Sequence, residues 1–205
     1  GMNDIAQAKA SFAAQAAIFR RKHNWLMCLL YLGTFGSFIG YAAGFPLLIK
    51  NEFPSINPLA YAWLGPLIGA IVRPFGGWLA DKLGGARVTL WNFVVMALAV
   101  GGVLFFLPSG PSGGNFGGFF VSFLALFFTT GIGNGSTFRM IPAIFLALNL
   151  READPHDRDA VERATKQGNT EAAATLGFTA AIAAYGGFFI PKSYGSSISL
   201  TGGPE

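Results

Sequence analysis

The stretch Tyr61–Lys82, which reads YAWLGPLIGAIVRPFGGWLADK, decides the fold class of this sequence. Apart from one cation near its middle, Arg73, it carries no charge before Asp81. A helix needs about 20 apolar residues to cross the ~30 Å hydrocarbon core of a bilayer, and this stretch provides that length. It therefore predicts a membrane-spanning helix that holds a positive charge inside the membrane.

Arg73 is the residue from which a function can be argued. A charge inside a bilayer is costly, so an intramembrane ionisable residue is a functional candidate, and an arginine cannot realistically release its proton. Arg73 must therefore face a partner, a watery cavity or an anion, and we interpret it as the binding group of a transporter for a small anion. The alternative is a structural arginine that snorkels or caps carbonyls of a neighbouring helix. Its depth inside Asp81, about 12 Å at 1.5 Å per residue, is large for snorkelling.

The composition places the chain among polytopic membrane proteins. Of its 205 residues, 52% are hydrophobic and 12% are charged, whereas soluble domains carry about 25% charged residues. The net charge of +4 does not indicate nucleic acid, because the basic residues flank apolar spans. The lone Cys28 provides neither a disulfide nor a metal cluster, so we expect no metal and no cofactor. No signal peptide is expected, since the first apolar span begins only at Trp25 and is too long.

We expect three regions along the chain. Residues 1–24 predict an amphipathic cytoplasmic juxtamembrane segment, residues 25–190 a transmembrane domain, and residues 191–205 a loop-like external tail. The five predicted spans are 25–49, 61–80, 88–107, 116–150 and 171–190, and residues 151–170 are expected to be a solvated cytoplasmic loop whose mixed charges could also form a latch.

The Lys and Arg residues predict the orientation. Two segments on one side carry only Lys50 and Lys192. Loops rich in Lys and Arg stay in the cytoplasm, so the opposite side, which includes the N-terminus, is expected inside and the C-terminus outside. No predicted span has Asp or Glu in its middle, and this positive buried field favours an anion as cargo. The residues expected in the cytoplasm are Lys9, Arg20, Arg21, Lys22, Lys82, Arg87, Arg151, Arg158, Arg163 and Lys166.

Depth along the helices connects separate spans. Tyr31 and Phe35 on the first span, Arg73 on the second, and Gly177 and Thr179 on the fifth all fall about 9–15 Å from the cytoplasmic ends. Tyr31 and Phe35 are four residues apart and share one helix face. A hydroxyl, an aromatic wall, an arginine and glycine backbone would make a small polar pocket in an apolar surround. Spacing alone favours the alternative in which both aromatics serve packing and Tyr31 bonds a neighbouring carbonyl.

The turn after Arg73 contains a recognisable motif. Gly77, Asp81, Lys82, Gly84 and Arg87 stand in GWLADKLGGAR, which resembles the G-x-L-A-D-[RK]-x-G-x-[RK]-[RK] loop of the major facilitator superfamily. Glycines let helices approach, the aspartate is expected to cap a helix N-terminus, and basic residues hold the loop at the cytoplasm. The alternative is a generic tight cytoplasmic turn.

Four further stretches extend the resemblance. Tyr31–Gly44, Gly65–Arg73, Gly131–Phe138 and Ala174–Pro191 together resemble the C-terminal half of the nitrate/nitrite porter family, over nearly the whole chain. The resemblance implies an all-α membrane protein of the bacterial inner membrane, whose five helices correspond to spans 7 to 11 and form most of a six-helix half of the major facilitator fold. The implied orientation agrees with the charge distribution.

The resemblance also implies roles for single residues. Arg73 matches the span-8 arginine of the pair that clamps the planar anion, and Tyr31 and Phe35 match the aromatics that line that site. A guanidinium suits nitrate or nitrite because two parallel N–H bonds meet two oxygens in one plane. The stretch from Gly177 to Gly187 matches the second nitrate signature, which contacts substrate and moves during gating; its members singled out here are Gly177, Thr179, Gly186 and Gly187.

The GIGNG stretch at residues 131–135 is read as a packing surface. It resembles a phosphate-binding loop, but no strand precedes it and it lies in an apolar helix. Gly131, Gly133 and Gly135 are expected to let helices approach, and gating flexibility can coexist with that role. Asn134 and Thr137 could polarise a pathway or form hydrogen bonds between helices.

Three other polar residues have simpler interpretations. Arg139 lies near the inner boundary of its span, where snorkelling costs little, and is expected to be structural or to line a vestibule. His23 and His156 have no metal-ligand companion at useful spacing and are expected to be solvated.

The resemblance implies a partner. The first half of the family fold, with the second arginine and the first nitrate signature, and span 12 are not in this sequence, so we expect the anion site to need the missing N-terminal half and a lipid bilayer around both. The leading hypothesis is the C-terminal half of a nitrate/nitrite transporter with rocker-switch alternating access. Exchange and proton symport both remain open. The alternatives are a porter of the same superfamily for another small anion, or a non-transporting membrane subunit or degenerate fragment. An enzyme is not expected, because the spans contain no nucleophile–base pair or carboxylate dyad.

Overall fold

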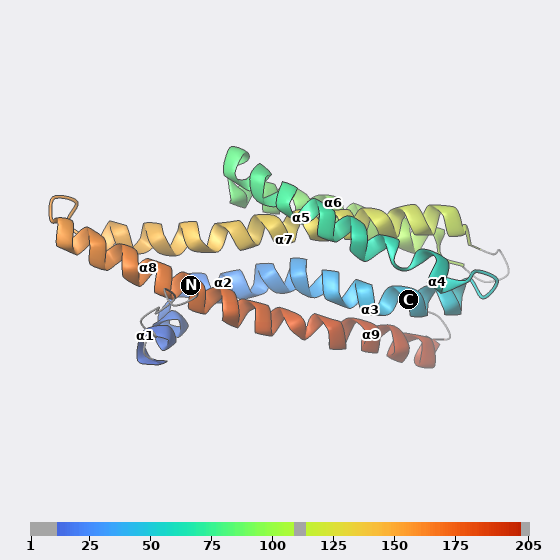
Figure 1. Cartoon of the computed structure of the whole chain (residues 1–205). Coiled ribbons are helices and arrows are strands. Elements are labelled where there is room, and N and C mark those ends of the chain that lie inside the picture. Colours follow the sequence, from blue (N-terminus) through green and yellow to red (C-terminus); the bar gives the residue numbers. More distant parts are fainter. Residues whose placement is uncertain (1–11, 109–113, 202–205) are drawn as a thin grey trace, which may run out of the picture.

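The computed structural model describes residues 12–108 and 114–201, and this part of the chain contains helices and no strand (Figure 1). In chain order the elements are α1 (Phe12–Ala16), the 3₁₀ turn η1 (Ala17–Arg20), α2 (Lys22–Tyr31), the π-helical turn η2 (Leu32–Gly36), α3 (Ser37–Glu52), α4 (Pro58–Tyr61), α5 (Leu64–Leu83), α6 (Gly85–Phe106), α7 (Phe116–Glu152), α8 (Arg158–Ala184) and α9 (Gly186–Thr201).

Five of the helical stretches in the described residues are long and apolar enough to cross a membrane. They cover Lys22–Glu52, Pro58–Leu83, Gly85–Phe106, Phe116–Glu152 and Arg158–Leu200. The prediction of an all-α membrane protein with five spanning helices is therefore confirmed. Most of these helical stretches extend beyond the predicted spans at one or both ends, by the largest amount at Arg158–Leu200.

Helix, and not loop, forms most of residues 151–170, so the expectation of a loop there is wrong. The connection between α7 and α8 is only the segment 153–157. The side chain of Asp157 accepts a hydrogen bond from the backbone N–H of Asp159 and caps the start of α8. The residues that follow are mainly Ala, Glu, Arg, Lys and Gln, which are strong helix formers. The two helices project together beyond the neighbouring helix ends, at the left of Figure 1.

The loop-like tail expected from Pro191 is also wrong over the described residues. The chain turns at Tyr185 and then continues as α9 to Thr201, with Pro191 inside the helix. Packing against α3 accounts for this helix. Gly40 lies against Ile190, and Gly44 lies against the ring of Tyr194. Residues 202–205 lie outside the described part.

The N-terminal segment is only partly described. The predicted juxtamembrane segment 1–24 falls partly on residues 1–11, which lie outside the described residues. From Phe12 to Arg20 the chain forms α1 and η1, and the first long helix begins directly afterwards at Lys22.

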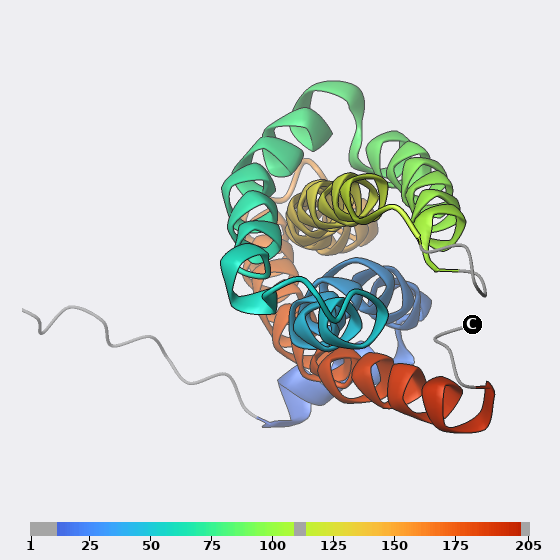
Figure 2. The ribbon, with the colours of Figure 1, turned by 90° about the vertical axis from the view of Figure 1, so that its right-hand side faces the viewer.

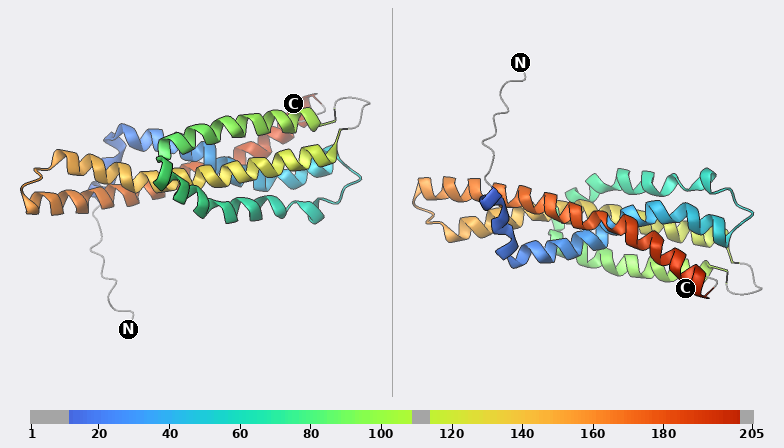
Figure 3. Two further views of the ribbon diagram at one scale, coloured as in Figure 1. Left: turned by 90° about the horizontal axis from the view of Figure 1, so that it is seen from above. Right: turned by 90° about the horizontal axis from the view of Figure 1, so that it is seen from below.

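Helix α7 lies at the centre of the bundle, between α5 and α6 on one side and α2–α3 and α8 on the other (Figure 2). The α8–α9 run extends along the length of the molecule beside α2–α3 (Figure 3). A cluster of buried aromatic rings fills one end of the bundle, where the rings of Phe45 and Phe123 stack at 4.2 Å between centroids. A smaller cluster that includes Met27 and Phe145 lies toward the other end.

Glycines bring α5 and α7 into direct backbone contact. A Cβ at Gly131 would meet the backbone of Gly69, and a Cβ at Gly76 would meet the backbone of Ile132. Close approach of this kind needs small residues. The geometry agrees with the packing interpretation of the GIGNG stretch, and its role in gating stays a prediction.

Candidate functional site

Arg73 lies in α5, and α7 sets the position of its backbone. A Cβ at Gly135 would overlap the carbonyl oxygen of Arg73, and Gly77 packs against the same glycine. The next residue, Pro74, cannot donate the usual helical hydrogen bond. The two helices therefore meet with no side chain between them at the level of Arg73.

The side chain of Arg73 lies among aromatic rings. Its Nη2 donates a long hydrogen bond of 3.5 Å to the hydroxyl of Tyr31. Its Cζ lies 5.7 Å from the centroid of the Phe35 ring and 5.4 Å from that of Phe138. Both distances are within the range of cation–π attraction. Among the described residues no carboxylate pairs with Arg73, so most of its donors remain available.

Tyr31, Phe35 and Arg73 are therefore brought together, and we call these three with Phe138 the arginine cluster. Tyr31 is 2% exposed, and its ring lies 5.2 Å from that of Phe35. Within residues 12–108 and 114–201 its hydroxyl bonds to Arg73 and to no neighbouring carbonyl, which differs from the alternative that spacing alone favoured. The sequence reasoning gave no role to Phe138, although it lies at the end of the Gly131–Phe138 stretch.

Phe35 sits on an unusual backbone. Residues Leu32–Gly36 form the π-helical turn η2, and such turns are frequent at functional sites. Gly36 lies against the backbone of Ala183 and Gly186, and Gly187 lies against Ile39. The two signature glycines 186 and 187 thus pack against the turn that carries Phe35 and the first turn of α3.

Gly177 and Thr179 do not join the arginine cluster. Gly177 is exposed, with no atom within 4 Å of where its Cβ would lie, and it borders a surface hollow with Phe19 and Phe178. Thr179 is fully buried, and its hydroxyl donates to the carbonyl of Leu176 at 3.1 Å. Residues two positions apart on an α-helix point in directions about 200° apart. Gly177 and Thr179 therefore cannot share one helix face, although they lie at nearly the same depth.

Hydroxyl pairs cross between helices near the GIGNG stretch. Thr34 and Thr137 share a buried hydrogen bond of 3.2 Å, and Thr89 and Ser136 share one of 2.9 Å. Thr137 therefore forms the expected bond between helices. Asn134 is 2% exposed, and its Oδ1 has no hydrogen-bond partner among the described residues.

The loop motif after Arg73 forms an ion pair. The two carboxylate oxygens of Asp81 share the Nε–H of Arg139, at 2.8 and 3.0 Å. Both side chains lie on an exposed surface. The expectation that Asp81 caps a helix is wrong, because α6 starts at Gly85, its N-cap residue is Gly84, and no side chain caps it. Gly84 has φ of +89°, the left-handed region that glycine tolerates. Lys82 lies over the ring of Trp78 at 4.4 Å.

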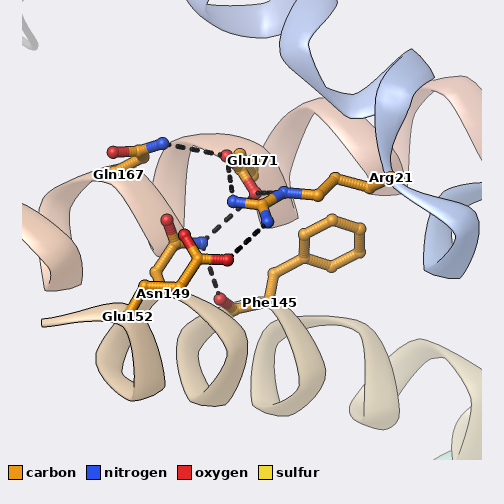
Figure 4. A network of polar contacts seen from close by, with 6 residues as sticks. All are labelled: Arg21, Phe145, Asn149, Glu152, Gln167 and Glu171. Atoms are coloured by element: carbon orange, nitrogen blue, oxygen red, sulfur yellow. Dashed lines mark hydrogen bonds and ion pairs between the residues drawn. The ribbon is translucent and has the colours of Figure 1, made fainter.

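A second polar cluster joins the residue before α2 to α7 and α8 (Figure 4). The buried carboxylate of Glu171 accepts from Arg21 Nε at 3.2 Å, from Gln167 at 3.1 Å and from Asn149 at 3.2 Å. Arg21 also bonds Glu152 at 2.9 Å. Glu152 and then Glu171 raise the pKa of Arg21, which stays charged. Sequence reasoning placed Glu171 only at a span end, although the idea of a latch in the 151–170 segment pointed to this region.

The comparisons with known proteins agree with the motifs. No protein-family model matches the chain. The chain is 50% identical over 204 residues to the nitrate/nitrite transporter NarU of Salmonella typhimurium. The matched region covers 100% of this chain and 44% of that protein. It is 38% identical over 200 residues to a Thermus thermophilus protein named "Probable nitrate/nitrite antiporter NarK2" (95% of this chain, 40% of that protein). It is 27% identical over 190 residues to the nitrite extrusion protein of Bacillus subtilis (91% and 40%).

These relatives indicate the kind of protein and how much of its length the chain covers. The three relatives are named as a transporter, a probable antiporter and an extrusion protein, and none is named as an enzyme. The chain spans less than half the length of each. With its membrane-capable helices it is a multi-pass membrane protein. Over nearly its whole length the chain is thus similar to part of proteins named as nitrate/nitrite transporters, in agreement with the family that its motifs indicate.

Proposed function

We propose that this chain is the C-terminal half of a nitrate/nitrite transporter and that Arg73 binds the anion. One observation carries the proposal: a charged guanidinium lies in a membrane-spanning helix among Tyr31, Phe35 and Phe138, with no carboxylate partner in the described residues. A buried charge without a counterion is costly. An anion supplies that counterion, and its oxygens can take two parallel N–H bonds from the guanidinium.

The aromatic rings limit the size of the cargo. Two rings, Phe35 and Phe138, lie within 6 Å of the guanidinium carbon, and an apolar surround of this kind suits a small planar anion more than a bulky organic one. The hydrogen bond from Arg73 to Tyr31 is long at 3.5 Å, so an anion oxygen can replace or share it at little cost. We assign Tyr31 the role of a second donor to the bound anion.

The other half of the site comes from a partner half of the transporter. The relatives' remaining length supplies it, and rocking of the two halves about the site gives alternating access. In this proposal Gly131 and Gly135 let α7 slide on α5, Gly133 lets α7 slide on α6 and η2, and Gly186 and Gly187 let α9 follow η2. The protein lies in the bacterial inner membrane with the N-terminus of this chain in the cytoplasm.

The test is nitrate uptake into proteoliposomes by the complete transporter, with Arg73→Lys beside it. Lysine keeps the charge but loses the planar fork, so uptake should fall strongly. Arg158→Lys, at the exposed start of α8, is the matched control and should keep uptake. Normal nitrate transport by Arg73→Lys would refute the clamp. Equal uptake of another small anion, measured by competition with chloride or formate, would refute the nitrate assignment.

A further inference from the structure

A groove between α5, α6 and α7 is not used by the anion site. It has a volume of about 490 Å³, and its walls include Phe75, Leu79, Trp91, Val95 and Phe128. Several of these large side chains are open to the surroundings, with Trp91 67% and Phe75 56% exposed. In a chain with five membrane-capable helices, an apolar groove between helices is a natural place for a hydrocarbon chain.

Arg87 gives this groove a charged end. It is exposed, lies in the first turn of α6, and lines the groove with the apolar residues. Arg87 makes no hydrogen bond or ion pair with the described residues, and the carboxylate of Asp81, in the same turn region, pairs with Arg139. Lys82, at the end of α5, stacks on Trp78. The end of the groove therefore carries excess positive charge.

The start of α6 adds to the attraction for an anion. Its first residues have no side-chain cap, and free backbone N–H groups and the helix dipole both favour negative charge there. Val95 lies eight residues further along α6, or about 12 Å from Arg87 at 1.5 Å per residue. Along α6 the groove thus begins with a cationic region at Arg87 and continues as an apolar region past Val95.

We propose that this groove binds an anionic phospholipid. Its phosphate lies at Arg87 and the start of α6, and one acyl chain runs along Trp91 and Val95 toward Phe128. The lipid would fill the space between α5 and α6 and support the helix that carries Arg73. The inference does not depend on which anion the protein transports.

The first test is native mass spectrometry of the protein released from nanodiscs of phosphatidylglycerol and phosphatidylethanolamine in equal amounts. Phosphatidylglycerol should remain bound in preference. Arg87→Gln should reduce that preference about five-fold, since one basic residue near the membrane surface is worth about 1 kcal/mol toward anionic lipid. Arg158→Gln, an equal loss of charge at the start of α8, should leave it unchanged. Equal retention of both lipids, or equal loss in both variants, would overturn the proposal.

The second test places the acyl chain. In a protein whose only tryptophan is Trp91 (Trp25, Trp63 and Trp78 changed to Phe), phosphatidylglycerol brominated on its acyl chain should quench fluorescence more than brominated phosphatidylethanolamine. Arg87→Gln should remove the difference. Absence of quenching by either lipid would show that a protein segment fills the groove, and equal quenching by both would show ordinary bilayer lipid; each result contradicts a specific site.

Discussion

Gly135 determines how closely Arg73 approaches α7. Because a Cβ there would overlap the Arg73 carbonyl oxygen, Gly135→Ala must push α5 away and move the guanidinium. Overpacking of this kind costs about 1–3 kcal/mol. We expect a lower unfolding temperature in detergent and weaker nitrate uptake by the complete transporter.

Gly101 is the control for that substitution. It lies in α6 with no atom within 4 Å of where its Cβ would lie, so Gly101→Ala should leave the unfolding temperature unchanged or raise it, because alanine favours a helix by up to about 1 kcal/mol. A loss of stability as large in Gly101→Ala as in Gly135→Ala would contradict the contact argument.

Phe138 tests the arginine cluster with a residue that sequence reasoning did not select. Phe138→Leu removes one ring from Arg73 and keeps an apolar side chain. A cation–π contact at a partly exposed site is worth about 0.5–1 kcal/mol, so the KM for nitrate of the complete transporter should change about two- to five-fold. Phe188→Leu is the control, since the ring of Phe188 also lies near a cation, 5.3 Å from Nζ of Lys192, and this change should leave KM unchanged. The same KM in both variants and the unmodified protein would exclude a role for the Phe138 ring.

At the scale of elements, Glu171 fixes the start of α2 to α7 and α8. Its carboxylate is buried and bonded to Arg21, Asn149 and Gln167. Glu171→Gln keeps the shape of the side chain but replaces the negative carboxylate with a neutral amide. Arg21 then loses one of its two carboxylate partners and keeps only Glu152. Removal of one partner from a buried ion pair costs about 3–5 kcal/mol, and we expect a loss near 3 kcal/mol in denaturant unfolding, since Glu152 still pairs with Arg21.

Glu152 provides the matched change in the same network. Its side chain is 63% exposed, and exposed ion pairs contribute about 1 kcal/mol or less. Glu152→Gln should therefore have a small effect. If Glu152→Gln destabilised the protein as much as Glu171→Gln, burial would not be what gives the network its strength.

Over the whole molecule, apolar length and helix phase could be read from the sequence, and polar or tertiary effects could not. The number of long apolar helices followed from apolar length. Depth placed Arg73, Tyr31 and Phe35 at one level, but spacing alone favoured packing aromatics, and the family resemblance grouped the three residues into one site. Gly177 and Thr179 were misplaced because depth says nothing of direction around a helix. Residues 158–170 were expected to form a loop because their charges were weighed above their helix propensity and the Asp157 cap.

The assembly of the complete transporter gives the last prediction. The chain spans 44% of the Salmonella relative, and α5 leaves Leu67, Ile71 and Phe75 exposed at helical spacing. An exposed apolar stripe beside a half-buried arginine fits a surface that faces both lipid and a partner half. We therefore expect this chain alone to bind little nitrate in proteoliposomes, because a site at the interface of two halves needs both walls.

Co-expression with the N-terminal half of the Salmonella transporter should restore nitrate uptake and raise the unfolding temperature of this chain. Arg73→Lys should abolish the restored uptake and keep the increase in stability, since Arg73 is expected to serve the anion and not the contact between halves. Uptake by this chain alone at the level of the co-expressed pair would show that copies of it complete the pathway. In that case the partner-half proposal fails, even if Arg73 still binds the anion.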